Sequence, residues 1–91
     1  MIIHGYGGSG ILFYKIMKPL SEKFHCIYLD IIGMGASSRP KFDCKTPDEG
    51  DMFFVDFIEQ WRVAFGDIKD FFLAGHSFGG YICGQYAYRY P

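Results

Sequence analysis

Ser77 lies at the centre of a Gly-x-Ser-x-Gly pattern whose residue types suit nucleophilic chemistry. An apolar run ends at Gly75, Gly79 follows the serine, and Tyr81–Tyr90 contains no helix breaker. This order predicts a strand, a very tight turn and a helix, with the serine hydroxyl projecting from the turn. The two glycines leave room where strand and helix pass in contact, because a Cβ atom would collide there. We therefore predict that Ser77 is a nucleophile and that Gly75 and Gly79 support its turn.

Chance and a membrane span both account for this stretch less well than a reactive turn does. The five-residue pattern occurs by chance in many sequences, but here the strand before it and the helix after it supply the context that the motif requires. Phe71–Tyr88 has no charged residue and nearly the length of a membrane span, yet His76, Ser77, Gln85 and four glycines interrupt it. We expect a reactive turn here and no transmembrane segment.

An acyl-transfer site also needs hydrogen-bond donors for the negative charge that develops on the carbonyl oxygen. The backbone N–H of Phe78, at the positive end of the predicted helix, is one predicted donor. The second is predicted on the glycine-rich loop His4–Gly10, at Tyr6, with Gly5 before it. Each donor of this kind contributes roughly two to three orders of magnitude in rate. The Tyr6 side chain is also expected to line the acyl pocket.

The sequence offers three histidines, and each is expected to have a structural role. His76 neighbours the serine in the turn, so its side chain is expected to diverge from the hydroxyl. His4, where the first strand ends, is expected to order the next loop through hydrogen bonds, and His25 starts a strand. In proteins with this type of turn the partners follow in the order Ser, acid, His, which puts both beyond Pro91. A triad serine without its base loses about four to six orders of magnitude in rate, so this chain alone is expected to be nearly inert.

Strands alternate with helices along the chain, which predicts an α/β fold with a parallel sheet. The predicted strands are Met1–Ile3, His25–Ile31 and Phe71–Gly75, and the predicted helices are Ile11–Phe24, Asp51–Phe65 and Tyr81–Tyr90. If both crossovers are right-handed and their helices cover opposite faces, the first strand lies in the middle of a doubly wound sheet. The change of direction opens a crevice at the carboxyl ends of strands one and three, where ligands bind in such sheets. The His4–Gly10 loop and Ser77 both lie at those ends.

Apolar residues at intervals of three and four give the first two predicted helices one apolar face each. These residues are Ile11, Leu12, Ile16, Leu20 and Phe24 in the first helix, and Phe54, Ile58, Trp61 and Phe65 in the second. Pro19 is expected to end or kink the first helix. Asp48, Glu49 and Asp51 are acids near the N-terminus of the second, where the helix dipole favours them.

Length and composition allow one small domain, predicted over residues 1–91. About half of the residues are apolar, so the chain can form a core. A net charge of −1 without a basic cluster argues against nucleic acid as a partner. Three irregularly spaced cysteines, and no secretory leader at Met1–His4, favour a cytoplasmic location over a disulfide framework or a zinc site.

Two short matches to other motifs are rejected on geometry. The pair Gly33 and Gly35 follows a strand as in a dinucleotide fingerprint, but the third glycine and a helix start are missing. His25 and Asp30 match the His-x-x-x-x-Asp spacing of some acyltransferases, yet residues five apart on a strand face opposite sides. We expect no cofactor and no bound metal.

Three motifs, in this order along the chain, resemble those of the α/β-hydrolase fold: His4–Gly8, Asp30–Ser37 and Gly75–Gly80. The resemblance spans essentially the whole chain. It implies a doubly wound parallel sheet of which residues 1–91 hold three central strands with alternating helices, from the oxyanion loop through the helix after the nucleophile elbow. It also implies that the fold is incomplete at both ends, because the first two strands, the acid, the base and the lid lie outside these residues.

Ser38–Phe42, Ile58–Arg62 and Tyr86–Pro91 resemble one subfamily, which contains N-acyl-phosphatidylethanolamine lysophospholipases and a lipid-droplet lipase coactivator. This resemblance implies a serine hydrolase that cleaves the carboxylic esters of lysophospholipids, phospholipids or other lipids, without a cofactor. It also implies peripheral association with membranes or lipid droplets. In the coactivator branch the nucleophile is replaced, whereas Ser77 is retained here.

Two alternatives remain on the same fold. One is a non-catalytic lipase coactivator that binds lipases or lipid droplets, and the other is an esterase or peptidase with a different substrate. Epoxide hydrolases and dehalogenases resemble this turn but carry Asp at the nucleophile position, so the serine at position 77 disfavours them.

Overall fold

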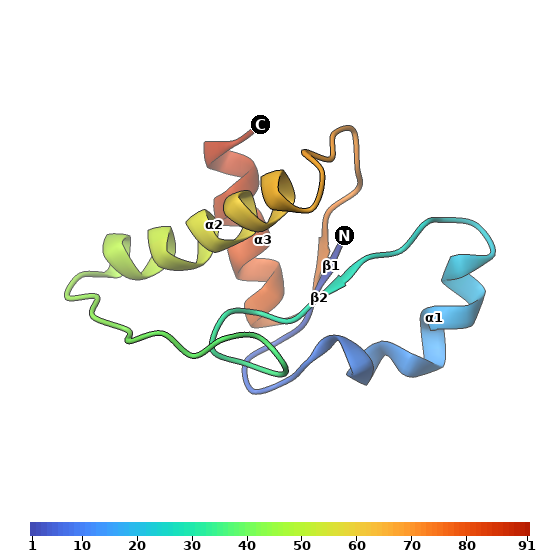
Figure 1. The fold of residues 1–91 in the computed structure, drawn as a ribbon, viewed down its shortest axis with the longest axis horizontal. Coiled ribbons are helices and arrows are strands. Elements are labelled where there is room, and N and C mark those ends of the chain that lie inside the picture. The colour runs from blue at the N-terminus through green and yellow to red at the C-terminus, as the bar shows by residue number, and fades with distance from the viewer.

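The sheet has three short parallel strands in the computed structural model, which describes all 91 residues (Figure 1). The central strand β1 (Ile2–Ile3) pairs with β2 (Tyr28–Leu29) on one side and with β3 (Ala74–Gly75) on the other. The prediction that the first strand lies in the middle of a parallel sheet is therefore confirmed.

Helices connect the strands and cover both sides of the sheet. A short 3-10 turn, η1 (Gly10–Phe13), leads into α1 (Tyr14–Ser21), while α2 (Pro47–Ala64) and α3 (Phe78–Arg89) follow β2 and β3. Figure 1 shows α1 on one side of the sheet and α2 with α3 on the other. This arrangement is the predicted doubly wound α/β architecture. None of the helices combines the length and the apolar character that a membrane-spanning segment requires.

Both outer strands are shorter than their predicted ranges, which were His25–Ile31 and Phe71–Gly75. Each outer strand pairs only with β1, and β1 is two residues long. A ladder of hydrogen bonds cannot extend much beyond its shorter member, so the remaining residues of both ranges have no strand partner.

Helix α1 differs from its prediction at both ends and on its apolar face. It begins at Tyr14, behind η1, and ends soon after Pro19, whose ring carries no N–H to continue the helix. The predicted apolar face is exposed, at 66% for Ile11, 65% for Leu12 and 45% for Ile16. The prediction of a buried face was wrong because α1 packs on η1 and no layer covers that face within residues 1–91.

Helix α2 begins at Pro47, one turn before the predicted start at Asp51. The Thr46 side chain accepts a hydrogen bond from the Glu49 N–H at 3.1 Å, and the proline occupies the first turn, where its missing N–H has no partner to lose. Asp48 and Glu49 lie in this first turn, where the helix dipole favours acids as predicted. Thr46 and Glu49 have capping-box spacing, so the start could have been identified from the sequence.

The core lies between the sheet and the pair α2 and α3. Its buried side chains are Met1, Ile3, Leu29, Ile31, Val55, Ile58, Ile82, Cys83 and Tyr86. The predicted stripe on α2 is correct at Ile58 but misses Val55, and Phe54 is only partly buried. Phe65, predicted to be buried, is 55% exposed and stacks on Trp61 with ring centroids 4.7 Å apart.

Candidate active site

Ser77 lies between β3 and α3 in a backbone conformation that is rare for a residue with a side chain. Its φ is 55° and its ψ is −120°, outside the main allowed regions for L-amino acids. Such a conformation costs on the order of 1–3 kcal/mol and persists only where the surrounding structure enforces it. The side chain is exposed and makes no hydrogen bond to the start of α3. The strand, the tight turn and the helix follow in the predicted order.

Glycines surround this turn at points where a Cβ atom would not fit. At Gly75 an added Cβ would lie less than 3.0 Å from the backbone of Gly79, and at Gly79 it would lie less than 3.0 Å from the backbone of Ile3. At Gly5 it would lie 3.3 Å from the Cβ of Ser77. The loop after β1 and the turn after β3 are therefore in direct contact, although they are far apart in the sequence.

His4 is buried and links the loop after β1 to the segment after β2. Its Nε2 accepts a hydrogen bond from the Ile31 N–H at 2.9 Å, so this nitrogen carries no proton in the neutral ring. The other nitrogen, Nδ1, therefore carries the proton and donates it to the Gly5 carbonyl at 2.7 Å. Both ring nitrogens are occupied by backbone groups, which is a structural role and leaves none for Ser77.

Asp30 fixes two loops at once, and the sequence patterns did not identify it as a site residue. Its carboxylate accepts hydrogen bonds from the Gly10 N–H at 2.7 Å and from the Ala36 N–H at 2.9 Å. These bonds, with that of Ala36 the stronger influence, hold the pKa of Asp30 below its usual value. The Ser37 hydroxyl donates to the Asp30 carbonyl at 2.6 Å. The available signal was an acid directly after a buried strand and before two glycines, Gly33 and Gly35, which both adopt positive φ.

Tyr6 and Phe78 meet beside Ser77. Their rings lie edge to face with centroids 6.4 Å apart, although Tyr6 is 84% exposed. The backbone N–H groups of both residues donate to no protein acceptor. Two free N–H groups next to a strained serine, one of them at the positive end of α3, can receive negative charge that develops on a substrate oxygen.

The other two histidine rings lie apart from any partner of the serine. His76 is exposed, and its backbone N–H donates to the Ile3 carbonyl at 3.1 Å while its ring makes no hydrogen bond. His25 lines a separate cavity with Phe24 and Phe72. No histidine ring is hydrogen-bonded to Ser77, so residues 1–91 supply no general base in contact with its hydroxyl.

An apolar pocket opens beside Tyr6 and Phe78. Its volume is about 420 Å³, and it is lined by Tyr6, Ile32, Gly33, Met34, Pro40, Phe42, Phe53, Phe54 and Phe78. The lining comes from the loops after β1 and β2, the first half of α2 and the start of α3. The expectation that the Tyr6 side chain lines a pocket beside the serine agrees with this geometry.

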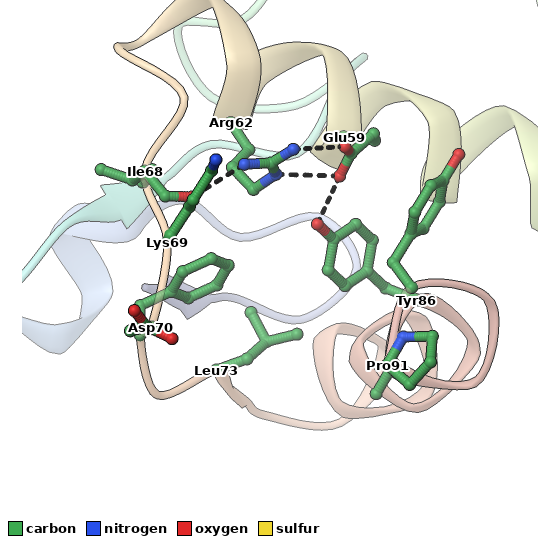
Figure 2. A pocket seen from close by; sticks show the side chains of 11 residues that line it. Glu59, Arg62, Ile68, Lys69, Asp70, Leu73, Tyr86 and Pro91 are labelled. Atoms are coloured by element: carbon green, nitrogen blue, oxygen red, sulfur yellow. Dashed lines mark hydrogen bonds and ion pairs between the residues drawn. The ribbon is translucent and has the colours of Figure 1, made fainter.

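A second cleft, of about 570 Å³, lies near the other end of α3 (Figure 2). Arg62 forms an ion pair with Glu59 at 2.6 Å and another with Asp67 at 2.8 Å, and it donates to the Ile68 carbonyl at 2.8 Å. The Tyr86 hydroxyl donates to the remaining Glu59 oxygen at 2.5 Å, as Figure 2 shows. These groups join α2, α3 and the turn after α2, and none of them is left free for chemistry.

The pKa values in this second cluster follow from the same contacts. The Arg62 hydrogen bond is the main reason that the pKa of Glu59 lies below its usual value. Burial, helped by the bond to Glu59, raises the pKa of Tyr86 to about 12. The phenol is therefore neutral and the carboxylate charged at physiological pH, which is the arrangement that their hydrogen bond needs. No group of three or more His, Cys, Asp or Glu side chains is placed to hold a metal ion.

A family model described as the alpha/beta hydrolase fold matches residues 1–91. A probable 1-acylglycerol-3-phosphate O-acyltransferase from Oryza sativa subsp. japonica is 42% identical over 91 residues, which are all of this chain and 22% of that protein. The (lyso)-N-acylphosphatidylethanolamine lipase of Homo sapiens is 37% identical over 91 residues, and the 1-acylglycerol-3-phosphate O-acyltransferase ABHD5 of Homo sapiens is 35% identical over the same number. In both human comparisons the match covers all of this chain and 26% of the relative.

The chain thus spans about a quarter or less of the length of these curated relatives. No solved structure matches it. The family match covers every residue, and the predicted order of strands, loops and helices agrees with it. The chain belongs to the alpha/beta hydrolase fold family.

Proposed function

We propose that residues 1–91 carry the nucleophile and the oxyanion loop of a serine hydrolase that cleaves lipid acyl esters. The observation that carries this proposal is the backbone of Ser77, held at φ 55° in contact with Gly5 and exposed at the start of α3. Strain at a single exposed serine is characteristic of a functional position. The free N–H groups of Tyr6 and Phe78 are the proposed oxyanion donors.

In the proposed reaction, the Ser77 Oγ attacks the ester carbonyl carbon and the carbonyl π electrons move onto the oxygen. The N–H groups of Tyr6 and Phe78 stabilise this oxyanion. When it collapses, the bond to the leaving alkoxide breaks, and the proton from the serine passes through a general base to the leaving alcohol. Water then attacks the acyl-enzyme, which releases the fatty acid and returns the proton to Ser77.

We propose that the acid and the histidine of the triad come from segments outside residues 1–91. Two observations support this: both nitrogens of the His4 ring are occupied by backbone groups, and no other histidine is bonded to Ser77. The Ser, acid, His order of this architecture places both partners after the serine. Residues 1–91 are then one part of a hydrolase domain and are nearly inert alone.

Lipid is the proposed substrate class because the relatives are called lipases and acyltransferases of acylated glycerophospholipids. Peripheral attachment to a membrane or a lipid droplet is part of the same proposal. An acyl-enzyme on Ser77 serves either outcome, because water as acceptor gives hydrolysis and a glycerophosphate hydroxyl gives acyl transfer. The acyltransferase names among the relatives make transfer to 1-acylglycerol-3-phosphate the second candidate.

The test uses the full-length protein and a tagged alkyl fluorophosphonate, which reacts with activated serines. We expect a covalent adduct on the peptide that contains Ser77, no adduct in Ser77→Ala, and an unchanged adduct in the matched control Ser38→Ala, whose side chain is exposed and unbonded. Equal labelling of wild type and Ser77→Ala would refute the nucleophile assignment.

A product assay then separates the candidates. Lysophospholipid vesicles, with and without 1-acylglycerol-3-phosphate, yield free fatty acid from a hydrolase and phosphatidic acid from an acyltransferase. A non-catalytic coactivator yields neither, and its binding to lipase or droplet survives Ser77→Ala.

A further inference from the structure

The apolar pocket beside Tyr6 has the size and composition of a ligand site. Its volume of about 420 Å³ falls within the usual range of small-molecule pockets. None of its nine lining residues is charged, and the only polar side-chain atom among them is the Tyr6 hydroxyl. Such a lining recognises an uncharged, apolar group and offers no partner to a headgroup phosphate or amine.

A continuous series of aromatic rings connects this pocket to Ser77. Phe78 follows the serine directly, and its ring meets that of Phe54 edge to face with centroids 5.2 Å apart. The Phe53 ring lies 5.1 Å from that of Phe54, and the Phe42 ring lies 5.0 Å from that of Phe53. The pocket therefore begins at the residue after the proposed nucleophile and ends at Phe42 and Phe53.

We infer that this pocket holds the acyl chain of the ester whose carbonyl carbon reacts with Ser77. The inference rests on the proposed function and adds the location and the wall of the acyl site. Its near end is formed by Tyr6 and Phe78, the proposed oxyanion donors, so a carbonyl held by their N–H groups has its alkyl chain at the mouth of the pocket. The far end, at Phe42 and Phe53, sets the chain length that fits.

The far wall can be changed without touching the reacting groups. Phe42 is 55% exposed on the loop after β2 and makes ring contacts only with Phe53 and Phe54. Phe42→Ala removes the end of the pocket, and Phe42→Trp fills it. Phe72→Trp is the matched control, because this phenylalanine is 81% exposed and lines a different cavity.

The experiment measures the labelling rate of the full-length protein with alkyl fluorophosphonates of graded chain length. In wild type we expect the rate to rise about fourfold per added methylene until the pocket is full, which follows from the usual contribution of a buried methylene. Phe42→Ala shifts the optimum to longer chains, and Phe42→Trp shifts it to shorter chains. Phe72→Trp leaves the optimum unchanged.

The outcomes separate the two proposals. Labelling of Ser77 with the same chain-length profile in all variants would overturn the acyl pocket and leave the nucleophile in place. An absence of labelling at Ser77 would overturn both. A shift for Phe72→Trp equal to that for the Phe42 variants would also refute the pocket, because it would show a general loosening.

Discussion

Helix α3 begins at one cluster of polar groups and approaches a second near its end, and the two clusters are built in opposite ways. At its start, Ser77 is strained and exposed, and the N–H groups of Tyr6 and Phe78 donate to no protein atom. Near its end, the Tyr86 hydroxyl, the Glu59 carboxylate and the Arg62 guanidinium all have partners. The first cluster leaves hydrogen-bonding capacity for a ligand, whereas the second uses its capacity to join α2 to α3.

This contrast shows how the fold supports a strained turn. The Ser77 conformation is unfavourable by itself, so favourable contacts elsewhere on α3 must hold the helix in place. Ile82 and Cys83 are buried in the core, and Tyr86 is bonded to Glu59. Function and stability therefore depend on different turns of one helix, and they should respond separately to mutation.

The largest expected effect comes from Ser77→Gly in the full-length protein. Glycine adopts positive φ without a steric penalty, so we expect the melting temperature to rise or stay constant. Without the hydroxyl, fluorophosphonate labelling and ester hydrolysis should fall by about four to six orders of magnitude. Thermal unfolding and a labelling assay check the two effects, and a large loss of stability would show that the serine has a structural role.

Tyr86→Phe should have the reverse effect. Removing the hydroxyl breaks a hydrogen bond to a charged carboxylate at a buried position, with an expected loss of about 1–2 kcal/mol in the free energy of unfolding. Urea denaturation measures this loss, and the labelling rate of Ser77 should stay within a factor of two of wild type. Tyr88→Phe, at an 83% exposed position, is the control. A strong loss of labelling without a loss of stability would contradict the separation.

The smallest effect sharpens the comparison at the loops. The pKa of Asp30 is lowered by the N–H groups of Ala36 and Gly10, so the ionised carboxylate stabilises the fold at neutral pH. This stabilisation is complete above the ordinary carboxyl pKa of about 4 and is lost as the pH falls through the lower pKa of the folded state. Asp30→Asn should therefore be less stable than wild type at pH 7, with the difference shrinking below pH of about 4.

Urea midpoints at a series of pH values test this dependence. Asp43→Asn is the matched control, because the Asp43 side chain is exposed and makes no hydrogen bond. A constant difference between Asp30→Asn and wild type across the acid range would show that the loops do not depend on the charge of Asp30.

The sequence predicted the features that follow from spacing and local sterics. The parallel sheet, its central strand and the turn at Ser77 all follow from alternating elements and from glycines at 75 and 79. The role of Asp30 could not be read from spacing, since its partners are backbone N–H groups whose positions depend on two folded loops. The exposure of Ile11 and Leu12 was also not predictable, because a helical repeat identifies an apolar face but not the layer that covers it.

The His4 ring has one further consequence. Because one imidazole joins the carbonyl of Gly5 to the amide of Ile31, the stretch that carries Tyr6 and the stretch that begins at Ile32 form one mechanical unit. A bulky guest that pushes the second stretch outward must pull on the first and displace the Tyr6 amide. Tolerance of large guests and precision of chemistry are thereby opposed, and a substitution that removes this ring, such as His4→Ala, would relax both together.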